Sequence, residues 1–191
     1  MDISFENKRK AQKGRILLSD PFSNDDYFGR SVVYLCDHNS EGSFGFVLNN
    51  YIDLDLHEIA KNFPNIKTRV SVGGPVETQS IYFLHTLENK IEGSQHVGDG
   101  IYVGGDYSQL TELIEKKEVS EKDVRFFLGY SGWTKGQLQE EIESHAWIVV
   151  PVINKHEVLD TNIDKLYEHY MRREGKKYDI LSQFPSDFMA N

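Results

Sequence analysis

The sequence contains one cysteine and no long apolar run. A lone thiol, Cys36, cannot form a disulfide within its own chain, and proteins without disulfides are typical of reducing compartments. No apolar run approaches the ~18 residues that a membrane-spanning helix needs, and residues 1–15 lack the apolar segment of a secretory signal. We therefore expect a cytoplasmic protein with no membrane association.

Positive charge is also scarce. The chain has 21 Lys and Arg residues against 30 Asp and Glu residues, which gives a formal net charge of −9. Proteins that bind nucleic acids usually present a basic face that displaces counterions from phosphates, so we expect no direct nucleic-acid binding. Two short basic segments, residues 8–15 and 172–177, are interpreted as solvated charge. A DNA-associated regulator that uses the first segment stays open as an alternative.

Aromatic residues and short apolar runs, by contrast, are abundant. With 11 Phe, 10 Tyr and 2 Trp in 191 residues, the chain has enough apolar surface for one domain with a substantial core. We expect residues 1–13 to form a flexible basic arm. We expect residues 14–191 to form a single domain that includes a C-terminal helix.

The spacing of the apolar residues predicts the secondary structure. Residues 30–37 and 44–48 flank the turn segment HNSEGS and predict a hairpin, whose first strand is apolar on both faces and therefore central. Further strands are predicted within 14–22, 69–77, 80–86, 100–106, 124–130 and 146–151, and helices within 54–63, 106–118, 135–145 and 162–174. Adjacent hairpins without regular βαβ units predict an α+β fold with a mixed or mainly antiparallel, curled sheet.

The segment GYSGWTKGQLQEEI, residues 129–142, follows an apolar strand and leads into a helical pattern. One hypothesis is a nucleophile elbow, G-x-S-x-G, which would make Ser131 the nucleophile of a hydrolase. Trp133 occupies the place of the final glycine, however, and spacing selects no histidine and acid to activate the serine. We favour a helix start, in which Thr134 is the N-cap, Gln137 completes the capping box and Trp133 forms a hydrophobic staple.

Other candidate sites are incomplete. Cys36 and His38 lie two residues apart on a predicted strand and so share a face, where they could form a thiolate nucleophile or two metal ligands. No further Cys-x-x-Cys or His-x-x-x-His spacing completes a metal site, so we expect no metal and no cofactor. The Gly-Gly pairs at 73–74 and 104–105 lack the lysine of a phosphate loop and predict turns with positive φ. The glutamates of segment 140–143 are interpreted as a solvated helix face.

Three ordered blocks of the sequence resemble the signature of the bacterial YqgE/AlgH family. They are residues 20–50, 70–85 and 126–151, and the resemblance spans Gly14–Pro151. The family implies a compact, single-domain α+β fold in which a barrel-like sheet is flanked by helices. Its members are described as uncharacterised or as transcriptional regulators, and no catalytic residues are agreed for them. The present sequence has no helix-turn-helix pair with a basic recognition helix.

The positions that match the family blocks supply candidate binding residues. The polar or amphipathic ones are His38, Asn39, Asn49, His85, Tyr130, Trp133 and Gln137. The alternative is that these side chains satisfy one another and the backbone. We expect a non-catalytic binding or regulatory module that contacts an unidentified small molecule or protein near the 129–138 turn and the 37–49 hairpin. A hydrolase that uses Ser131 or Cys36 is the alternative.

Overall fold

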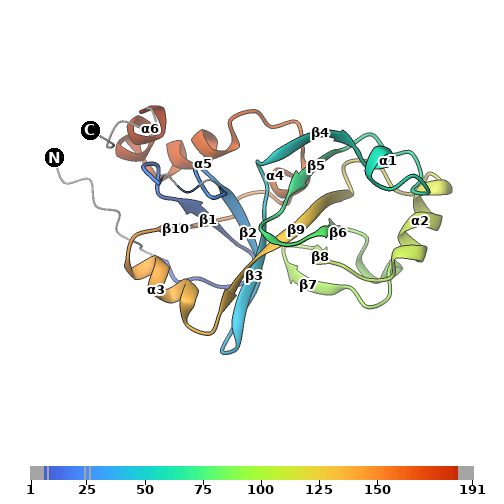
Figure 1. Cartoon of the computed structure of the whole chain (residues 1–191), viewed down its shortest axis with the longest axis horizontal. Helices are drawn as coiled ribbons and strands as arrows, with labels where there is room; N and C mark the ends of the chain where they lie inside the picture. Colours follow the sequence, from blue (N-terminus) through green and yellow to red (C-terminus); the bar gives the residue numbers. More distant parts are fainter. Residues whose placement is uncertain (1–6, 8, 24, 26, 185–191) are drawn as a thin grey trace.

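A computed structural model describes residues 7, 9–23, 25 and 27–184. In this part of the chain ten strands form one sheet that is flanked by helices (Figure 1). The strands are β1 (Arg15–Ser19), β2 (Val32–Asn39), β3 (Gly42–Val47), β4 (Tyr51–Asp55), β5 (Arg69–Val72), β6 (Val76–His85), β7 (Gln95–Gly98), β8 (Ile101–Val103), β9 (Val124–Thr134) and β10 (Trp147–Pro151). The helices are α1 (Leu56–Ile59), α2 (Tyr107–Glu115), α3 (Gln137–Glu143), α4 (Lys155–Leu159), α5 (Leu166–Glu174) and α6 (Lys176–Gln183). This set of elements confirms the predicted α+β fold.

The sheet is mainly antiparallel and curled, as predicted. Its strand order is β10-β1-β2-β3-β9-β6-β8-β7, while β4 pairs with β5 and β5 pairs with β9. Among the described strands, β5 and β9 form the one parallel pair. The two ends of the sheet, β10 and β7, do not pair with each other. The barrel-like sheet that the family resemblance implies is therefore an open, curled sheet.

Strand β9 connects the two parts of the sheet and crosses the middle of the molecule (Figure 1). One edge of β9 pairs with β6, and the other edge pairs first with β5 and then with β3. Strands β1 and β10 with helix α3 lie on one side of β9, and β6–β8 with α1 and α2 lie on the other (Figure 1). The hairpin formed by β2 and β3 therefore runs along the C-terminal half of β9.

The prediction that the first hairpin strand is central is confirmed. Strand β2 lies between β1 and β3. Its side chains Tyr34 and Cys36 belong to the largest core cluster, which also contains residues of α5, whereas Val33 and Leu35 belong to a second cluster with α3. Because both faces of β2 are covered, its apolar run is unbroken.

The predicted boundary between strand and helix after residue 130 is wrong. Strand β9 continues through Ser131 to Thr134, and α3 begins at Gln137 after Gly136, which has a φ of 78°. Glycine adopts this left-handed conformation with little strain. Part of the predicted cap is present, because the Thr134 N–H donates to Gln137 Oε1 at 3.0 Å. Thr134 itself ends the strand and is not the N-cap residue.

The other helices agree with the sequence pattern in type and differ in length. Helix α1 has only four residues, although its N-terminus is as predicted: the Asp55 N–H donates to Glu58 Oε2 at 2.7 Å. Helix α5 begins at Leu166, later than the pattern predicts. The short elements β4, β7, α4 and α6 are additional to those that the sequence pattern predicts.

The N-terminal arm contacts the domain where it is described. Asn7 covers the outer edge of β10, because its Nδ2 donates to Trp147 O at 2.7 Å and its Oδ1 accepts from the Val149 N–H at 2.8 Å. Arg9 forms an ion pair of 2.7 Å with Glu174 of α5. The flexibility of the arm and its boundary with the domain stay predictions. Within the described residues, no helix is long and apolar enough to cross a membrane.

Candidate functional site

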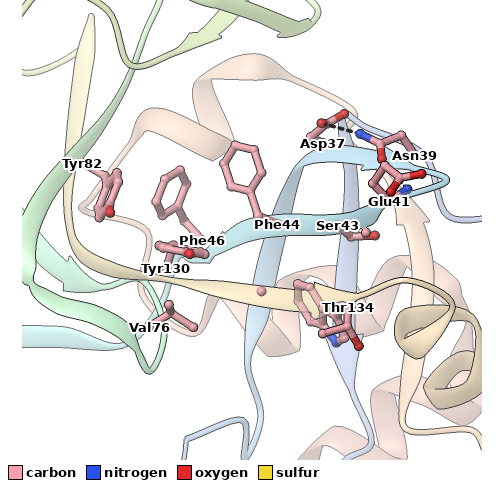
Figure 2. A pocket seen from close by; sticks show the side chains of 13 residues that line it. Asp37, Asn39, Glu41, Ser43, Phe44, Phe46, Val76, Tyr82, Tyr130 and Thr134 are labelled. Carbon is pink, nitrogen blue, oxygen red and sulfur yellow. Dashed lines mark hydrogen bonds between the residues drawn. The ribbon is translucent and has the colours of Figure 1, made fainter.

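The β2–β3 hairpin and the strands beside it line an open cavity of about 680 Å³, which we name the hairpin pocket (Figure 2). It is lined by Asp37, Asn39, Glu41, Gly42, Ser43, Phe44, Phe46, Val76, Tyr82, Tyr130, Gly132, Trp133 and Thr134. The volume falls within the ~300–1,000 Å³ that is usual for small-molecule sites.

Four aromatic rings from β3, β6 and β9 form one end of the hairpin pocket (Figure 2). Phe44 packs edge-to-face against Phe46 and against Tyr130, with ring centroids 6.1 Å and 6.2 Å apart. Tyr82 packs edge-to-face against Tyr130 at 5.5 Å. These separations are typical of favourable aromatic pairs, so the rings hold one another in place and form a rigid apolar wall.

The turn of the hairpin forms the other, acidic end of the pocket (Figure 2). Asn39 Nδ2 donates to Asp37 Oδ2 at 2.9 Å, and Asn39 Oδ1 accepts from the Glu41 N–H at 2.8 Å. Asn39 thus fixes the turn that carries both carboxylates. Among the described residues that line the pocket there is no Lys, Arg or His. The two carboxylates therefore make the electrostatic potential in the pocket negative.

Glu77 places a further carboxylate beside the aromatic end. The Tyr82 hydroxyl donates to Glu77 Oε2. Burial, together with this hydrogen bond, raises the pKa of Tyr82 to about 12. The phenol therefore stays protonated and neutral at physiological pH, and the aromatic wall adds no charge of its own.

A second hollow, of about 340 Å³, lies beside Trp133, which lines both cavities. Its floor is organised by Glu141, whose Oε2 accepts from Trp133 Nε1 at 2.8 Å and from Trp147 Nε1 at 2.7 Å. Gln137 Nε2 donates to the other oxygen, Oε1, at 2.9 Å. The interpretation of residues 140–143 as a solvated face is therefore wrong for Glu141. The only signal in the sequence is its spacing of four residues from Gln137.

Ser131 lies inside strand β9 and not at an elbow. Its side chain is 0% exposed, and its Oγ donates to Gly73 O at 2.9 Å. It pairs with Gly45 of β3, and it is not among the residues that line the hairpin pocket. An activated serine needs a hydrogen-bonded base within reach, whereas the described partner of Ser131 is a backbone carbonyl.

The expectation that Cys36 and His38 share a face is wrong. A β-bulge at Cys36 shifts the alternation of β2, so that Asp37 pairs with Phe44 and His38 pairs with Ser43. His38 Nδ1 lies 2.7 Å from Ser43 Oγ. Cys36 is buried, and burial raises the pKa of its thiol well above the usual value. A reactive cysteine requires the opposite shift.

Asn49 lies away from the hairpin pocket and connects two segments of backbone. Its Oδ1 accepts from the Val32 N–H at 2.8 Å, and its Nδ2 donates to Arg30 O at 2.9 Å. Both polar ends of the side chain are thereby satisfied, and the amide holds the start of β2 beside the end of β3.

His85 does not line the pocket either. It lies on β6 three residues after Tyr82, and because side chains alternate along a strand it points to the opposite face of the sheet. The ring is 0% exposed; Nδ1 accepts from the Leu87 N–H at 3.2 Å, and Nε2 donates to Gly104 O at 3.1 Å. Burial lowers the pKa of His85, so the neutral ring with a proton on Nε2 fits this place.

The seven predicted binding residues therefore fall into three groups. Asn39, Tyr130 and Trp133 line the hairpin pocket. Gln137 lines the hollow beside Trp133, and His38 does not line the pocket but bonds to Ser43, which does. Asn49 and His85 line neither cavity. Asn49 bonds to backbone groups, and His85 bonds to backbone groups and also lies 2.9 Å from Ser94 Oγ. Their roles in binding stay predictions.

The Gly-Gly-Pro turn brings the start of β6 against the backbone of β9. A Cβ on Gly74 would lie 2.3 Å from the carbonyl carbon of Tyr130, and Gly74 has a φ of 155°. No side chain fits there. The predicted positive φ is confirmed at Gly74 and at Gly104 and Gly105, but not at Gly73.

Arg125 is a buried charge that the sequence reasoning missed. It is 0% exposed; its Nη1 donates to Val158 O at 2.8 Å, and its Nη2 donates to Leu48 O and, at 3.1 Å, to Tyr51 Oη. Burial lowers the pKa of its guanidinium below the usual value. The signal was present in the sequence as a single charge inside the apolar run VRFFL.

No group of three or more His, Cys, Asp or Glu side chains suited to a metal ion occurs within the described ranges. Within the described residues, two carboxylates, those of Asp37 and Glu41, line the hairpin pocket. The expectations of no metal and no cofactor stay predictions.

The fold and the pocket together define a class: one α+β domain built on an open, curled ten-stranded sheet, with a cavity beside its central hairpin. A crystal structure of a protein from Corynebacterium diphtheriae has the same fold, with a TM-score of 0.78 and 22% identity over 94% of this chain and 95% of that one. The solution structure of the AlgH protein from Pseudomonas aeruginosa gives a TM-score of 0.72 and 24% identity over 94% of this chain and 98% of that one.

Relatives found by sequence have a higher identity to this chain than these two structures have. A UPF0301 protein of Cytophaga hutchinsonii is 38% identical over 180 residues, which are 94% of this chain and 98% of the relative. A UPF0301 protein of Bacteroides fragilis is 37% identical over 180 residues, 94% of this chain and 91% of the relative. The model of the DUF179 family, described as AlgH-like, matches residues 16–179. The chain belongs to this AlgH-like family, as the resemblance of its sequence blocks implies.

Proposed function

We propose that the protein is a non-catalytic binding module and that the hairpin pocket is its ligand site. The observation that carries this proposal is the convergence of an aromatic wall and two turn carboxylates on one cavity of about 680 Å³. The wall comes from β3, β6 and β9, which are far apart in the sequence. A mainly apolar cavity with a few polar groups is the usual form of a small-molecule site.

Two features support a role in binding without catalysis. Ser131 is committed to a hydrogen bond with Gly73 O, and Cys36 is a buried thiol with a raised pKa. Neither alternative nucleophile opens into the hairpin pocket. The single free cysteine also supports our proposal that the protein acts in the reducing cytoplasm.

We propose a regulatory role in which ligand binding is the signal, and we include no nucleic acid among the partners. The basic segments near both ends of the chain are partly neutralised. Arg9 pairs with Glu174 at 2.7 Å and Arg173 pairs with Glu157 at 2.9 Å. With a net charge of −9, this leaves little basic surface for phosphates.

Thermal unfolding in the presence of a library of small aromatic fragments tests the proposal. A ligand that binds only the folded state raises the unfolding midpoint. Fragments that stabilise the wild type should lose this effect in Tyr130→Ala, which removes one side of the pocket. They should keep it in Tyr107→Ala, which removes a tyrosine that is 41% exposed and does not line the pocket. Equal stabilisation of the two variants would place the site elsewhere.

A further inference from the structure

We propose that the hairpin pocket selects an organic cation: a small molecule with a ring-sized apolar body and a primary ammonium group. This inference rests on the proposed function of the pocket and names the chemical class of its ligand.

The first argument is the charge around the cavity. Asp37 and Glu41 are the charged residues that line the pocket within the described part of the chain, and both are acidic. Lys135 follows Thr134 directly but does not line the cavity. An anion would meet like charges here without a basic partner, which costs binding energy, whereas a cation meets complementary charge.

The second argument is that the two carboxylates have unequal partners. Asp37 accepts from the His38 N–H at 2.9 Å and from Asn39 Nδ2 at 2.9 Å. Glu41, which is exposed, accepts only from Ser40 Oγ at 3.3 Å among its described contacts. Asp37 is therefore held in a fixed position, and both groups retain acceptor capacity for the three N–H donors of an ammonium group.

The third argument is the separation of the two ends of the pocket. In Figure 2 the rings of Phe44, Tyr82 and Tyr130 gather at one end, and Asp37 and Glu41 lie at the other. A ligand that fills this shape has an apolar body on the rings and its charge at the turn. Aromatic faces also attract cations directly, so the wall does not oppose a positive ligand.

The fourth argument decides the source of the cation. A cavity of about 680 Å³ has the size of a small-molecule site. Strand β3, which carries Phe44, is paired on both edges, with β2 and with β9, so an extended peptide has no strand edge to join at this place. These observations favour a free small molecule over a basic segment of a partner protein.

Three probes that share a phenethyl group test the inference: phenethylamine, phenethyl alcohol and hydrocinnamate carry a cation, a neutral hydroxyl and an anion. Each is titrated into the ¹⁵N-labelled full chain, and amide chemical shifts are followed. We expect saturable shifts at Gly42–Phe44 and Tyr130–Thr134. Phenethylamine should bind at least about threefold more tightly than the alcohol, because an exposed charge pair contributes modestly, and hydrocinnamate should bind most weakly.

Matched charge variants locate the effect. Asp37→Asn combined with Glu41→Gln should weaken phenethylamine at least about threefold and leave phenethyl alcohol unchanged. Glu118→Gln combined with Glu121→Gln changes the net charge equally at exposed positions outside the pocket, and should leave all three affinities unchanged. Thermal unfolding of each variant verifies that the fold is retained.

The possible failures are distinguishable. If the alcohol or hydrocinnamate binds at the pocket as tightly as the amine, the pocket is a ligand site and the cation inference is overturned. If a dipeptide amide with an aromatic residue and a lysine binds there more than tenfold more tightly than phenethylamine, the small-molecule source is overturned. If no probe shifts the pocket amides, both the inference and the proposed function are contradicted.

Discussion

Trp133 and Glu141 are joined by a hydrogen bond of 2.8 Å from the indole Nε1 to the carboxylate Oε2, and the same oxygen accepts from Trp147 Nε1 at 2.7 Å. One helical carboxylate therefore holds the end of β9 and the start of β10. Because Trp133 also lines the hairpin pocket, this bond fixes the position of one lining residue of the proposed site.

Replacing Glu141 should destabilise the fold more than replacing its exposed neighbour. Glu141→Leu leaves the two indole N–H groups without this acceptor, at a cost of up to about 1–3 kcal/mol for each group. Glu140→Leu, on the solvent side of α3, should change the free energy of unfolding by less than about 0.5 kcal/mol. Urea denaturation of both variants measures the difference. Equal stabilities would show that the indole bonds contribute nothing.

Removing the hydroxyl of Ser131 should have only a small structural effect. Its Oγ donates to Gly73 O, which also accepts from the Val47 N–H at 2.8 Å, so the carbonyl keeps one partner. We expect Ser131→Ala to lower the free energy of unfolding by about 1 kcal/mol or less. A fluorophosphonate probe should not label the native wild type. Labelling that Ser131→Ala abolishes would restore the hydrolase alternative.

Gly74 should tolerate no side chain. In Gly74→Ala the new Cβ would overlap the backbone of Tyr130 at 2.3 Å, and β6 would have to move away from β9. Gly136→Ala is the matched control, since Gly136 also has a positive φ but nothing lies within 4 Å of the Cβ position. We expect the control to cost about 1 kcal/mol from backbone strain alone, and Gly74→Ala to cost several times more. Circular dichroism during thermal unfolding compares them.

The buried guanidinium of Arg125 should be essential to the fold. Arg125→Leu leaves the carbonyls of Leu48 and Val158 without this donor, and we expect a loss of at least about 2 kcal/mol. Arg172→Leu breaks an exposed ion pair of 3.3 Å with Asp179 and should cost less than about 1 kcal/mol. Chemical denaturation distinguishes the two. A neutral Arg125→Leu result would mean that the buried network is replaceable.

His85 should make the fold sensitive to acid. Burial lowers its pKa, so below the unfolded-state pKa of about 6.5 the unfolded chain binds a proton that the folded chain excludes. Stability is therefore present above that pH and falls as the pH drops toward the folded-state pKa. His85→Gln should reduce the slope of unfolding free energy against pH, and His156→Gln, at an exposed position, should not. Parallel slopes for all three proteins would contradict this assignment.

The strands that position the site follow from local pattern. The apolar run of β2 indicates a central strand because both of its faces are covered, and the turn residues after it indicate the hairpin. Single residues that alter the alternation are harder to predict. The bulge at Cys36 moves His38 to the opposite face, and no feature of the run VVYLCDHN signals an extra residue.

The end of β9 is hard to predict for a related reason. Gly129 and Gly132 resemble turn residues in sequence, yet both lie within the strand. Gly129 is required because a Cβ would lie 2.6 Å from Val76 O, a contact made by a strand from another part of the chain. Glu141 was missed on similar grounds, since its two indole partners are six and eight residues distant and meet only after β9 and β10 have paired with the sheet.

The most direct measurement of the central claim is a structure of the chain with a bound aromatic amine, determined by crystallography or by intermolecular NMR contacts. Our account predicts that the ring lies on Phe44 and Tyr130 and that the ammonium lies within hydrogen-bond distance of Asp37 or Glu41. An amine seated in the second hollow, between Trp133 and Trp147, would contradict it. So would an amine bound in the hairpin pocket with its charge directed away from the hairpin turn.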